Sequence, residues 1–216
     1  MGRSAYPLRA RKQPNRHCRW EQRLRIFLAG ATGVIGVRLI PLMLAEGHVV
    51  AAMTRTPEKM DGLRAAGVIP VLCDLFDPKS LNEAVKDFRP DVIAHQVTDL
   101  PDEIGKLTKF LAATDRVRSE GTRNLLAAAQ AVNASGFVAQ SIAWDGGPVI
   151  EAHENAVTSA GGTVLRYGRL YGPGTYYEKD LPPAPRLHID AVARRTMPFF
   201  AGPHGIFTIT DDDLAS

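Results

Sequence analysis

Three glycines, Gly30, Gly33 and Gly36, stand directly after an apolar run over residues 25–29 and directly before a helical pattern. The first glycine suits a tight turn, the second lets the main chain approach a ligand closely, and the third lets the helix pack against the strand. The N–H groups and the positive end of the helix dipole then face that ligand, which favours phosphate. We therefore predict a turn that holds the pyrophosphate of a dinucleotide, formed by Gly30, Ala31, Thr32, Gly33, Val34, Ile35 and Gly36.

The context of these glycines gives the motif its weight, because the spacing is one residue wider than the dinucleotide fingerprint G-x-G-x-x-G. A helical pattern over residues 34–46 follows the turn, and a second strand-like run covers residues 48–54. This order is typical of a βαβ unit. A purely structural glycine turn is the alternative.

The alternation of helix-like and strand-like segments continues along the chain. Helix-like patterns cover residues 57–66, 78–88, 107–132, with a break near 114–120, and 150–160, and strand-like runs cover residues 68–73, 91–96, 136–141 and 163–167. Strands separated by helices of this length predict a parallel sheet covered on both faces. The predicted fold is a doubly wound α/β domain, the Rossmann fold, with six strands.

Composition divides the chain into three parts. We predict a basic, disordered extension over residues 1–23, a dinucleotide-binding domain over residues 24–167 and a small substrate-side segment over residues 168–216. Residues 1–25 hold eight Arg or Lys against Glu21 alone, without the interleaving of aromatic residues or the helical periodicity of a nucleic-acid-binding arm. The last part is rich in Gly and Pro, with a helical pattern at residues 189–198 and a strand-like run at residues 205–210.

Several function classes are disfavoured by composition. No apolar run approaches the roughly 20 residues of a membrane helix, the N-terminal residues lack the apolar core of a secretory signal, and Cys18 and Cys73 lie outside any metal-ligand spacing. We expect a cytoplasmic protein without a metal, acting on a small molecule as a monomer or homodimer. Binding to a membrane or to nucleic acid is not expected.

These features together resemble the extended and atypical short-chain dehydrogenase/reductases, a group that includes nucleotide-sugar epimerases and dehydratases. The resemblance covers residues 25–212, and its matching pieces are residues 30–36, 120–126, 138–141, 165–174 and 188–190. It implies a Rossmann fold, a nicotinamide cofactor and an oxidoreductase or epimerase-like activity. No single piece identifies a substrate.

In this group the end of the second strand chooses between the two nicotinamide cofactors. A carboxylate there accepts a hydrogen bond from the ribose 2′-hydroxyl, whereas an Arg attracts a 2′-phosphate. Here the strand ends at Thr54 and Arg55, with no acid before Glu58, so we predict NADP, with NAD as the alternative. An ordinary solvated role for Arg55 stays open.

The resemblance also implies the rest of the cofactor site. Asp74 and Leu75 would lie near the adenine, and Val97 and Thr98 beside the ribose and nicotinamide. Asp74 could equally cap the next turn.

The catalytic residues depart from the group's pattern of a Ser, a Tyr that exchanges a proton with the substrate, and a Lys that lowers the pKa of the Tyr. Ser141 fits the first role. Aligning residues 153–157 with the group's usual Ala-Glu-x-x-Val puts Gly146 at the Tyr position and Ile150 at the Lys position, and neither transfers a proton. Tyr171, after the sixth strand, is the candidate substitute proton donor, with a non-catalytic role as its alternative, because members of the group that do not use it in catalysis also carry a Tyr there.

Other titratable residues have a structural interpretation beside a catalytic one. His95 and His153 are candidate bases, but each also suits a satisfied polar group. The resemblance gives His188 and Asp190 a structural role. Asp211 begins a run of three acids without the spacing of a metal loop, and we expect a solvated turn there.

Two functions follow, with a third from the basic extension. The first is an NADP-dependent oxidoreductase or epimerase-like enzyme acting on a small carbonyl or sugar-type substrate, because the short segment after residue 167 would enclose a nucleotide sugar poorly. The alternative is a catalytically degenerate NADP-binding sensor or regulatory protein. The third, binding of nucleic acid or an anionic surface through the extension, is not favoured.

Overall fold

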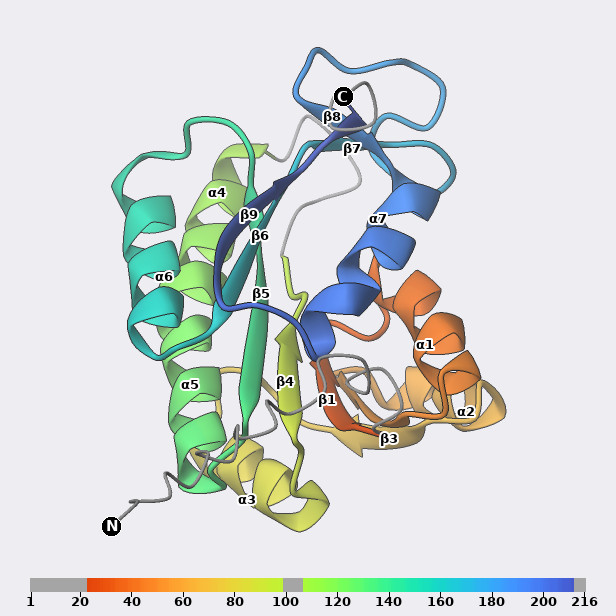
Figure 1. The fold of residues 1–216 in the computed structure, drawn as a ribbon. Coiled ribbons are helices and arrows are strands. Elements are labelled where there is room, and N and C mark those ends of the chain that lie inside the picture. The colour runs from red at the N-terminus through yellow and green to blue at the C-terminus, as the bar shows by residue number, and fades with distance from the viewer. Residues whose placement is uncertain (1–22, 99–106, 212–216) are drawn as a thin grey trace, which may run out of the picture.

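A computed structural model describes residues 23–98 and 107–211, with side chains from Ala112 onward in the second range. The extension expected over residues 1–23 lies almost wholly outside the described residues. At the centre stands a sheet of seven parallel strands in the order β3-β2-β1-β4-β5-β6-β9 (Figure 1). The doubly wound α/β fold expected from the sequence is confirmed.

The strands of this sheet follow the expected segments within two residues at each end. They are β1 (Arg25–Ala29), β2 (Val49–Thr54), β3 (Ile69–Leu72), β4 (Val92–His95), β5 (Gly136–Ile142), β6 (Thr163–Tyr167) and β9 (Gly205–Ile209). The expected number of six strands is wrong, because the strand-like run near the C-terminus also joins the sheet. It pairs parallel to β6, from Thr163 opposite Gly205 to Tyr167 opposite Ile209.

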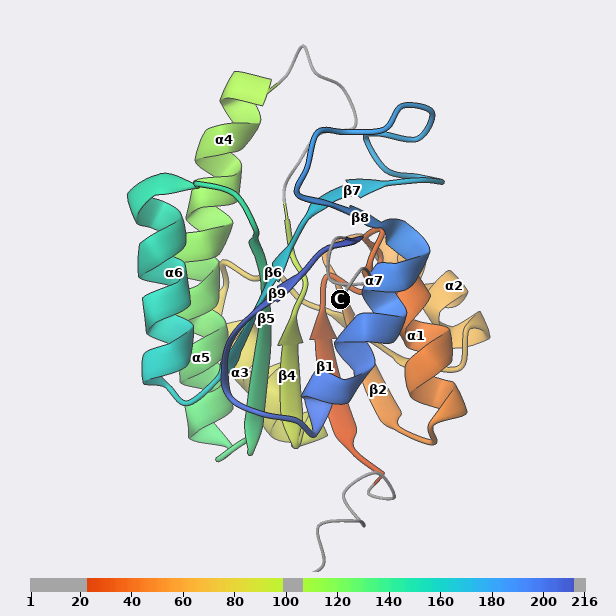
Figure 2. The same cartoon turned by 45° about the horizontal axis from the view of Figure 1, so that its top comes forward.

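Helices cover both faces of the sheet, as Figures 1 and 2 show. On one face lie α1 (Gly36–Ala45), η1 (Pro57–Lys59), α2 (Met60–Ala65), α7 (Ile189–Thr196) and η4 (Met197–Phe200). On the other lie α3 (Pro78–Phe88), α4 (Leu107–Arg116), the π-helical turn η3 (Val117–Gly121), α5 (Thr122–Ala131) and α6 (Gly147–Ser159). The expected break in the long helix is therefore a π-helical turn. None of the helices in the described part of the chain is long and apolar enough to cross a membrane.

The alternation of side chains along β1 explains why both faces are covered. Ile26 and Leu28 pack on the side of α1 and α7, whereas Phe27 and Ala29 pack on the side of α3 and α5, and all four are fully buried. Successive side chains of a strand point to opposite faces, so a run of apolar residues needs a helix layer on each side.

The C-terminal segment packs onto the face of the sheet that α1 covers. A small parallel sheet of β7 (Arg169–Tyr171) and β8 (Arg186–His188) leads into α7, which lies against α1. Arg38 of α1 donates hydrogen bonds to Asp190 Oδ1 (3.0 Å), to the Pro173 carbonyl (2.6 Å) and to the Val34 carbonyl (2.9 Å). One side chain thus joins the glycine turn to the segment after β6.

Candidate functional site

The glycine turn lies where the winding of the sheet changes direction. β1 and β4 are neighbours in the sheet, but the helix that follows β1 covers one face and the helices that follow β4 cover the other (Figure 2). Open α/β sheets bind ligands at the carboxyl ends of strands at such a point. The predicted turn therefore stands at the expected place for a ligand.

The surroundings of the three glycines fit a phosphate cradle. A Cβ on Gly30, which has a φ of +90°, would lie 2.6 Å from the backbone of Gln96, and a Cβ on Gly36 would lie 2.2 Å from the Gly30 carbonyl oxygen. A Cβ on Gly33 would meet only that same oxygen, at 3.4 Å. Packing thus requires the first and third glycines, whereas the second leaves the space that a phosphate would take.

The N-terminus of α1 follows the turn directly and directs the positive end of its dipole toward the same space. Ile35 precedes α1 and provides no side-chain cap, and the first turn holds no acidic residue. The N–H groups of Val37, Arg38 and Leu39 donate to the carbonyls of Gly33 and Ile35, so the helix dipole, rather than these N–H groups, favours an anion here. The pyrophosphate of a nicotinamide dinucleotide fits this turn and helix end.

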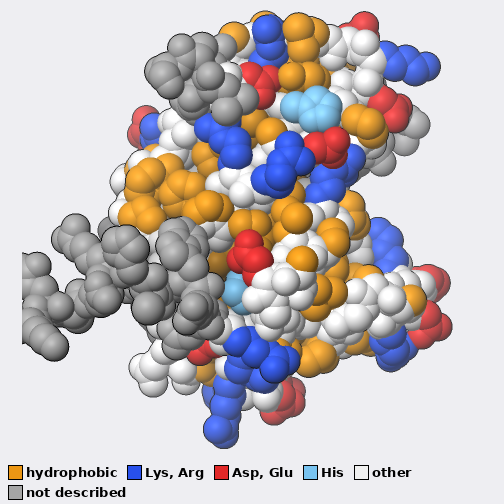
Figure 3. All heavy atoms as spheres, turned by 45° about the vertical axis from the view of Figure 1, so that its right-hand side comes forward, with side chains coloured by type: hydrophobic (Ala, Val, Ile, Leu, Met, Phe, Trp, Pro, Cys, Tyr) orange, Lys and Arg blue, Asp and Glu red, His pale blue; other side chains and the backbone are white. Residues whose placement is uncertain are grey.

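Basic residues gather beside the turn at the end of β2. Arg55 is exposed there, and Lys59 Nζ donates to Thr32 Oγ1 at 3.5 Å. Lys59 was not predicted from the sequence, although its position four residues after Arg55 in a short helical turn was a usable signal. A mostly apolar hollow of about 660 Å³ between α1 and α2 reaches both Thr32 and Lys59. Figure 3 shows exposed apolar and charged side chains mixed on the face that carries these helices.

The residues expected near the adenine have defined structural contacts. Asp74 Oδ1 accepts from the Phe76 N–H at 2.8 Å, which confirms the turn-capping alternative for Asp74. Leu75 is buried, and its carbonyl accepts from Asn124 Nδ2 at 3.0 Å. Contact of either residue with an adenine stays a prediction.

The residues expected near the nicotinamide follow β4. Val97 is half-buried and Thr98 is exposed, and the Val97 carbonyl accepts from Gln140 Nε2 of β5 at 3.0 Å. This hydrogen bond holds the backbone just after β4 against the side chain of Gln140 in β5. Both residues therefore stand at the same edge of the sheet as the glycine turn.

Ser141 of β5 is 3% exposed and bonded to an ion pair. Its Oγ donates to Glu154 Oε1 at 2.6 Å, and the same carboxylate accepts from Arg166 Nε at 2.9 Å. Burial raises the pKa of Glu154, but the hydrogen bonds from Arg166 and Ser141 outweigh burial and hold that pKa below its ordinary value. Glu154 is therefore ionised at neutral pH and fixes the direction of the Ser141 hydroxyl.

Gly146 and Ile150, the positions aligned with Tyr and Lys, lie together at the start of α6. A Cβ on Gly146 would lie 2.2 Å from Ile150 Cγ1. The Ile150 side chain thus fills the space next to Gly146 with apolar atoms. This geometry leaves Ser141 without a proton-transferring neighbour at either position.

Tyr171 of β7 donates its hydroxyl proton to Asp211 Oδ2 at 2.8 Å. This hydrogen bond raises the pKa of Tyr171, so the phenol stays protonated at neutral pH. Asp211 Oδ1 also accepts from the His188 N–H at 3.3 Å, so the solvated turn expected at Asp211 is wrong: Asp211 joins β7 to β8. His188 Nδ1 accepts from the Asp190 N–H at 3.3 Å, in the expected structural role.

His95 and His153 are buried and joined through Thr122. Thr122 Oγ1 lies 3.2 Å from His95 Nε2 and 2.8 Å from His153 Nδ1, and His153 Nε2 donates to the Gln140 carbonyl at 3.0 Å. Burial lowers the pKa of His95 to about 3 and also lowers the pKa of His153. Both rings are neutral at pH 7, and His153 is a satisfied polar group.

Arg118, in η3, is a buried residue of this region that sequence analysis missed. It is 7% exposed and lies four residues from Thr114 and four from Thr122, both buried. Arg118 lies inside the π-helical turn, whose place the helical periodicity of the sequence does not predict, so the sequence held no signal for its burial.

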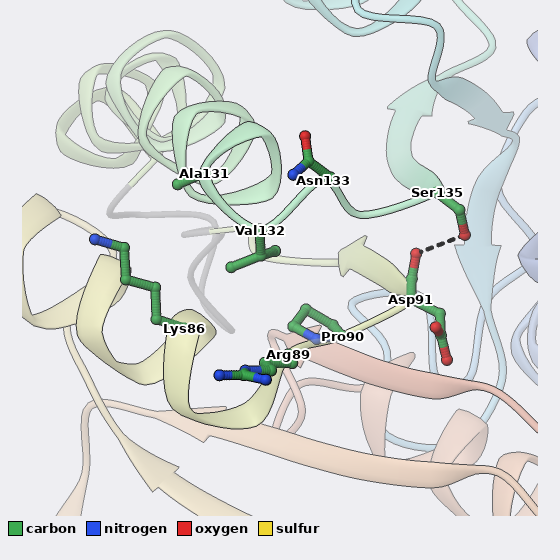
Figure 4. A pocket seen from close by; sticks show the side chains of 8 residues that line it. All are labelled: Lys86, Arg89, Pro90, Asp91, Ala131, Val132, Asn133 and Ser135. Carbon is green, nitrogen blue, oxygen red and sulfur yellow. Dashed lines mark hydrogen bonds between the residues drawn. The ribbon is translucent and has the colours of Figure 1, made fainter.

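A second hollow, of about 590 Å³, opens at the opposite edge of the sheet (Figure 4). It lies between the C-terminal ends of α3 and α5, lined by Arg89 and Asn133 among others, and Ser135 Oγ donates there to the Asp91 carbonyl at 3.0 Å. It contains none of the predicted site residues. Ligands of open sheets bind at the carboxyl edge, so we assign no site to this hollow.

Comparison with known proteins agrees with this geometry. A family described as NAD(P)H-binding matches residues 30–164, more than half of the chain. A 3-diazoavenalumate denitrifying reductase of Streptomyces is 37% identical over 186 residues, which cover 73% of this chain and 60% of that protein. A quinoline-oxide ketoreductase of Stigmatella aurantiaca is 28% identical over 61% of this chain and 38% of that protein. The chain therefore spans at most 60% of the length of these curated relatives.

Solved structures share the fold at low sequence identity. A short-chain dehydrogenase of Burkholderia cenocepacia in complex with NADP has a TM-score of 0.67 at 16% identity, over 90% of this chain and 92% of that one. The UDP-glucose 4-epimerase of Thermus thermophilus in complex with NAD has a TM-score of 0.69 at 20% identity, over 86% of this chain and 77% of that one. From its family match over residues 30–164, this chain belongs to the NAD(P)H-binding family, and its fold is the Rossmann fold.

Proposed function

We propose that this protein is an NADP-dependent reductase of a small carbonyl or sugar-type substrate. The observation that carries the proposal is the glycine turn at the β1–β4 switch, with Arg55 and Lys59 beside it and no acid at the end of β2. The name of the 37% identical relative, a reductase, supports the direction of the reaction.

The chain's own residues would divide the work in the following way. The glycine turn and the N-terminus of α1 bind the pyrophosphate, and Arg55 and Lys59 bind the 2′-phosphate. The nicotinamide, when bound, supplies a hydride. The Ser141 hydroxyl donates its hydrogen bond to Glu154, which leaves Ser141 Oγ as the atom that would orient the substrate at the carboxyl end of β5.

Tyr171 is the proposed proton donor. Its raised pKa keeps the phenol protonated, so it can give a proton to a developing alkoxide but is a poor base at neutral pH. In the structure Asp211 Oδ2 accepts the hydrogen bond from the Tyr171 hydroxyl, and a substrate oxygen would compete with Asp211 for this hydrogen bond.

Calorimetric titration with NADPH and NADH tests the cofactor assignment. NADPH should bind at least about tenfold more tightly, and Arg55→Ala should reduce that preference by about tenfold, the order of one charge-assisted hydrogen bond. Arg64→Ala is the matched control, because Arg64 is also exposed but forms an ion pair with Asp61 on α2. Equal binding of both cofactors, or an unchanged preference in Arg55→Ala, contradicts the NADP assignment.

The alternative is a sensor that binds NADP without catalysis, favoured by the apolar contact of Gly146 with Ile150. A carbonyl-substrate screen with NADPH separates the two functions. Turnover that Ser141→Ala abolishes, while NADPH binding persists, excludes the sensor. NADPH binding with no turnover on any substrate favours it.

A further inference from the structure

Arg118 is a buried cation that the described part of the chain does not neutralise. It is 7% exposed, and among the described residues no hydrogen bond and no ion pair engages its guanidinium. Burying an unpaired charge is costly, so a protein that keeps one usually gains a ligand or a function from it.

The charged groups around Arg118 do not cancel its charge. The buried carboxylate of Glu154 acts electrostatically on Arg118, but its oxygens already accept from Ser141 and Arg166. Asp115 is exposed to solvent, which screens it. Burial lowers the pKa of Arg118 more than Asp115 and Glu154 raise it. One positive charge is therefore left over in this region.

The histidines near Arg118 add no charge of their own at neutral pH. The pKa of His95 and that of His153 are lowered first by burial, and the Arg118 charge lowers both further. The guanidinium thus lies within electrostatic range of His95 at the end of β4, of His153, and of Glu154, which accepts the Ser141 hydrogen bond.

A second unpaired polar group lies one helical turn away. Thr114 is buried, and its Oγ1 has no hydrogen-bond partner among the described residues. The helix changes to a π-helical turn between Thr114 and Thr122, and such turns occur frequently at functional sites. A ligand that accepts hydrogen bonds from both Arg118 and Thr114 would satisfy both groups.

We propose that Arg118, assisted by Thr114, binds the carboxylate of a monoanionic substrate beside Ser141 and Glu154. The planar guanidinium fork matches a carboxylate with two parallel hydrogen bonds. One uncompensated buried cation balances one negative charge, which favours a monocarboxylate over a phosphate dianion. This inference rests on the proposed function, since it names the substrate class of the same site.

The test measures carboxylate binding to the full chain by calorimetry, with and without NADPH. The probes are acetate, benzoate and cinnamate, each with its neutral amide, and inorganic phosphate. The wild type should bind at least one carboxylate tenfold or more tightly than the matching amide, and Arg118→Gln should lose this preference. Arg123→Gln is the control, because Arg123 is an exposed arginine on the adjoining helix. A preference that survives in Arg118→Gln, or is missing in the wild type, overturns the proposal.

Thermal unfolding separates a binding role from a structural one. Arg118→Met removes the uncompensated charge and keeps an unbranched apolar side chain, so its Tm should equal or exceed that of the wild type. A Tm lowered by several degrees, as expected for an arginine that holds the fold, overturns the proposal. Arg118→Lys keeps the charge and should retain part of the carboxylate preference.

The cofactor titration keeps the two failures apart. Without NADPH or NADH binding, the proposed function fails, and the carboxylate preference is then judged on the cofactor-free protein. With normal cofactor binding and no carboxylate preference, only the role of Arg118 fails.

Discussion

At the scale of single residues, the three glycines differ in what they require. A Cβ added to Gly36 would lie only 2.2 Å from the carbonyl oxygen of Gly30. A Cβ added to Gly33 would lie 3.4 Å from the same oxygen, so Gly33 has room for a methyl group. The motif predicted a tight turn at Gly30, close approach of a ligand at Gly33 and helix packing at Gly36. The structure separates a packing role at Gly30 and Gly36 from an open side at Gly33.

Alanine substitutions should separate these roles. Gly36→Ala should lower the free energy of unfolding by about 3 kcal/mol, because the clash is with backbone. Gly33→Ala should fold normally but weaken NADPH binding about tenfold or more, since the methyl group takes the space of a phosphate. Chemical denaturation and calorimetry measure the two effects.

Gly62→Ala is the control, because an added Cβ at this helical residue meets nothing within 4 Å. It should leave NADPH binding unchanged and stabilise α2 by up to about 1 kcal/mol. Unchanged NADPH affinity in Gly33→Ala would remove Gly33 from the site.

The buried histidines should make stability depend on pH. In the unfolded chain His95 takes up a proton below about pH 6.5, whereas in the folded protein it stays neutral down to about pH 3. The unfolded state therefore binds more protons in this window, and the free energy of unfolding should fall with decreasing pH, by up to about 1.4 kcal/mol per unit for this group. The lowered pKa of His153 acts in the same direction.

Denaturant titrations at several pH values measure this slope. His95→Gln should flatten it between about pH 6.5 and pH 3, whatever its effect on stability at pH 7. His204→Gln should leave the slope unchanged, because His204 is exposed. An identical slope in the wild type and His95→Gln would mean that His95 is protonated in the folded protein.

At the scale of elements, sequence patterns located segments well and their contacts poorly. The expected helix at residues 78–88 and strand at residues 163–167 match α3 and β6 residue for residue, because Pro78 marks the helix start and Gly161 and Gly162 separate α6 from the strand. The inner position of Arg118 depends on the π-helical turn, and periodicity at 3.6 residues per turn does not predict where such a turn occurs. The link from Tyr171 to Asp211 spans 40 residues, beyond any local pattern.

Arg38 couples two elements that the sequence treats as separate. Its side chain bonds the Val34 carbonyl of the glycine turn, the Pro173 carbonyl and Asp190 of α7. Arg38→Gln should lower the free energy of unfolding by about 1 kcal/mol, because two of these bonds are exposed and one is half-buried. Hydrogen exchange should accelerate in β7 and the first turn of α7.

Arg64→Gln is the matched control, because the Arg64 side chain is exposed and forms its ion pair with Asp61 of its own helix. It should leave exchange in β7 and α7 unchanged. Protection that stays at the wild-type level in Arg38→Gln would show that the packing of α7 on α1 alone holds the segment.

At the scale of the whole molecule, the C-terminal segment is part of the central sheet. β9 pairs with β6 along five residues, and Ile209 is buried in the same core cluster as Leu165 and Tyr167 of β6. Residues 168–216 were predicted to lie outside the dinucleotide-binding domain because their Gly- and Pro-rich start interrupts the alternating pattern. Strand order is a property of long-range packing, and the short run at residues 205–210 carries no signal of its neighbour.

Truncation tests this integration. Deleting residues 205–216 removes β9, exposes the edge of β6 and uncovers the core near Ile209, so the protein should lose several kcal/mol of stability and aggregate. Deleting residues 212–216 alone keeps β9 and Asp211, and should leave Tm and the oligomeric state unchanged. Thermal unfolding and light scattering measure both variants. If the longer deletion keeps the wild-type Tm and remains dispersed, β9 is an accessory strand, and residues 24–167 with α7 suffice for the fold.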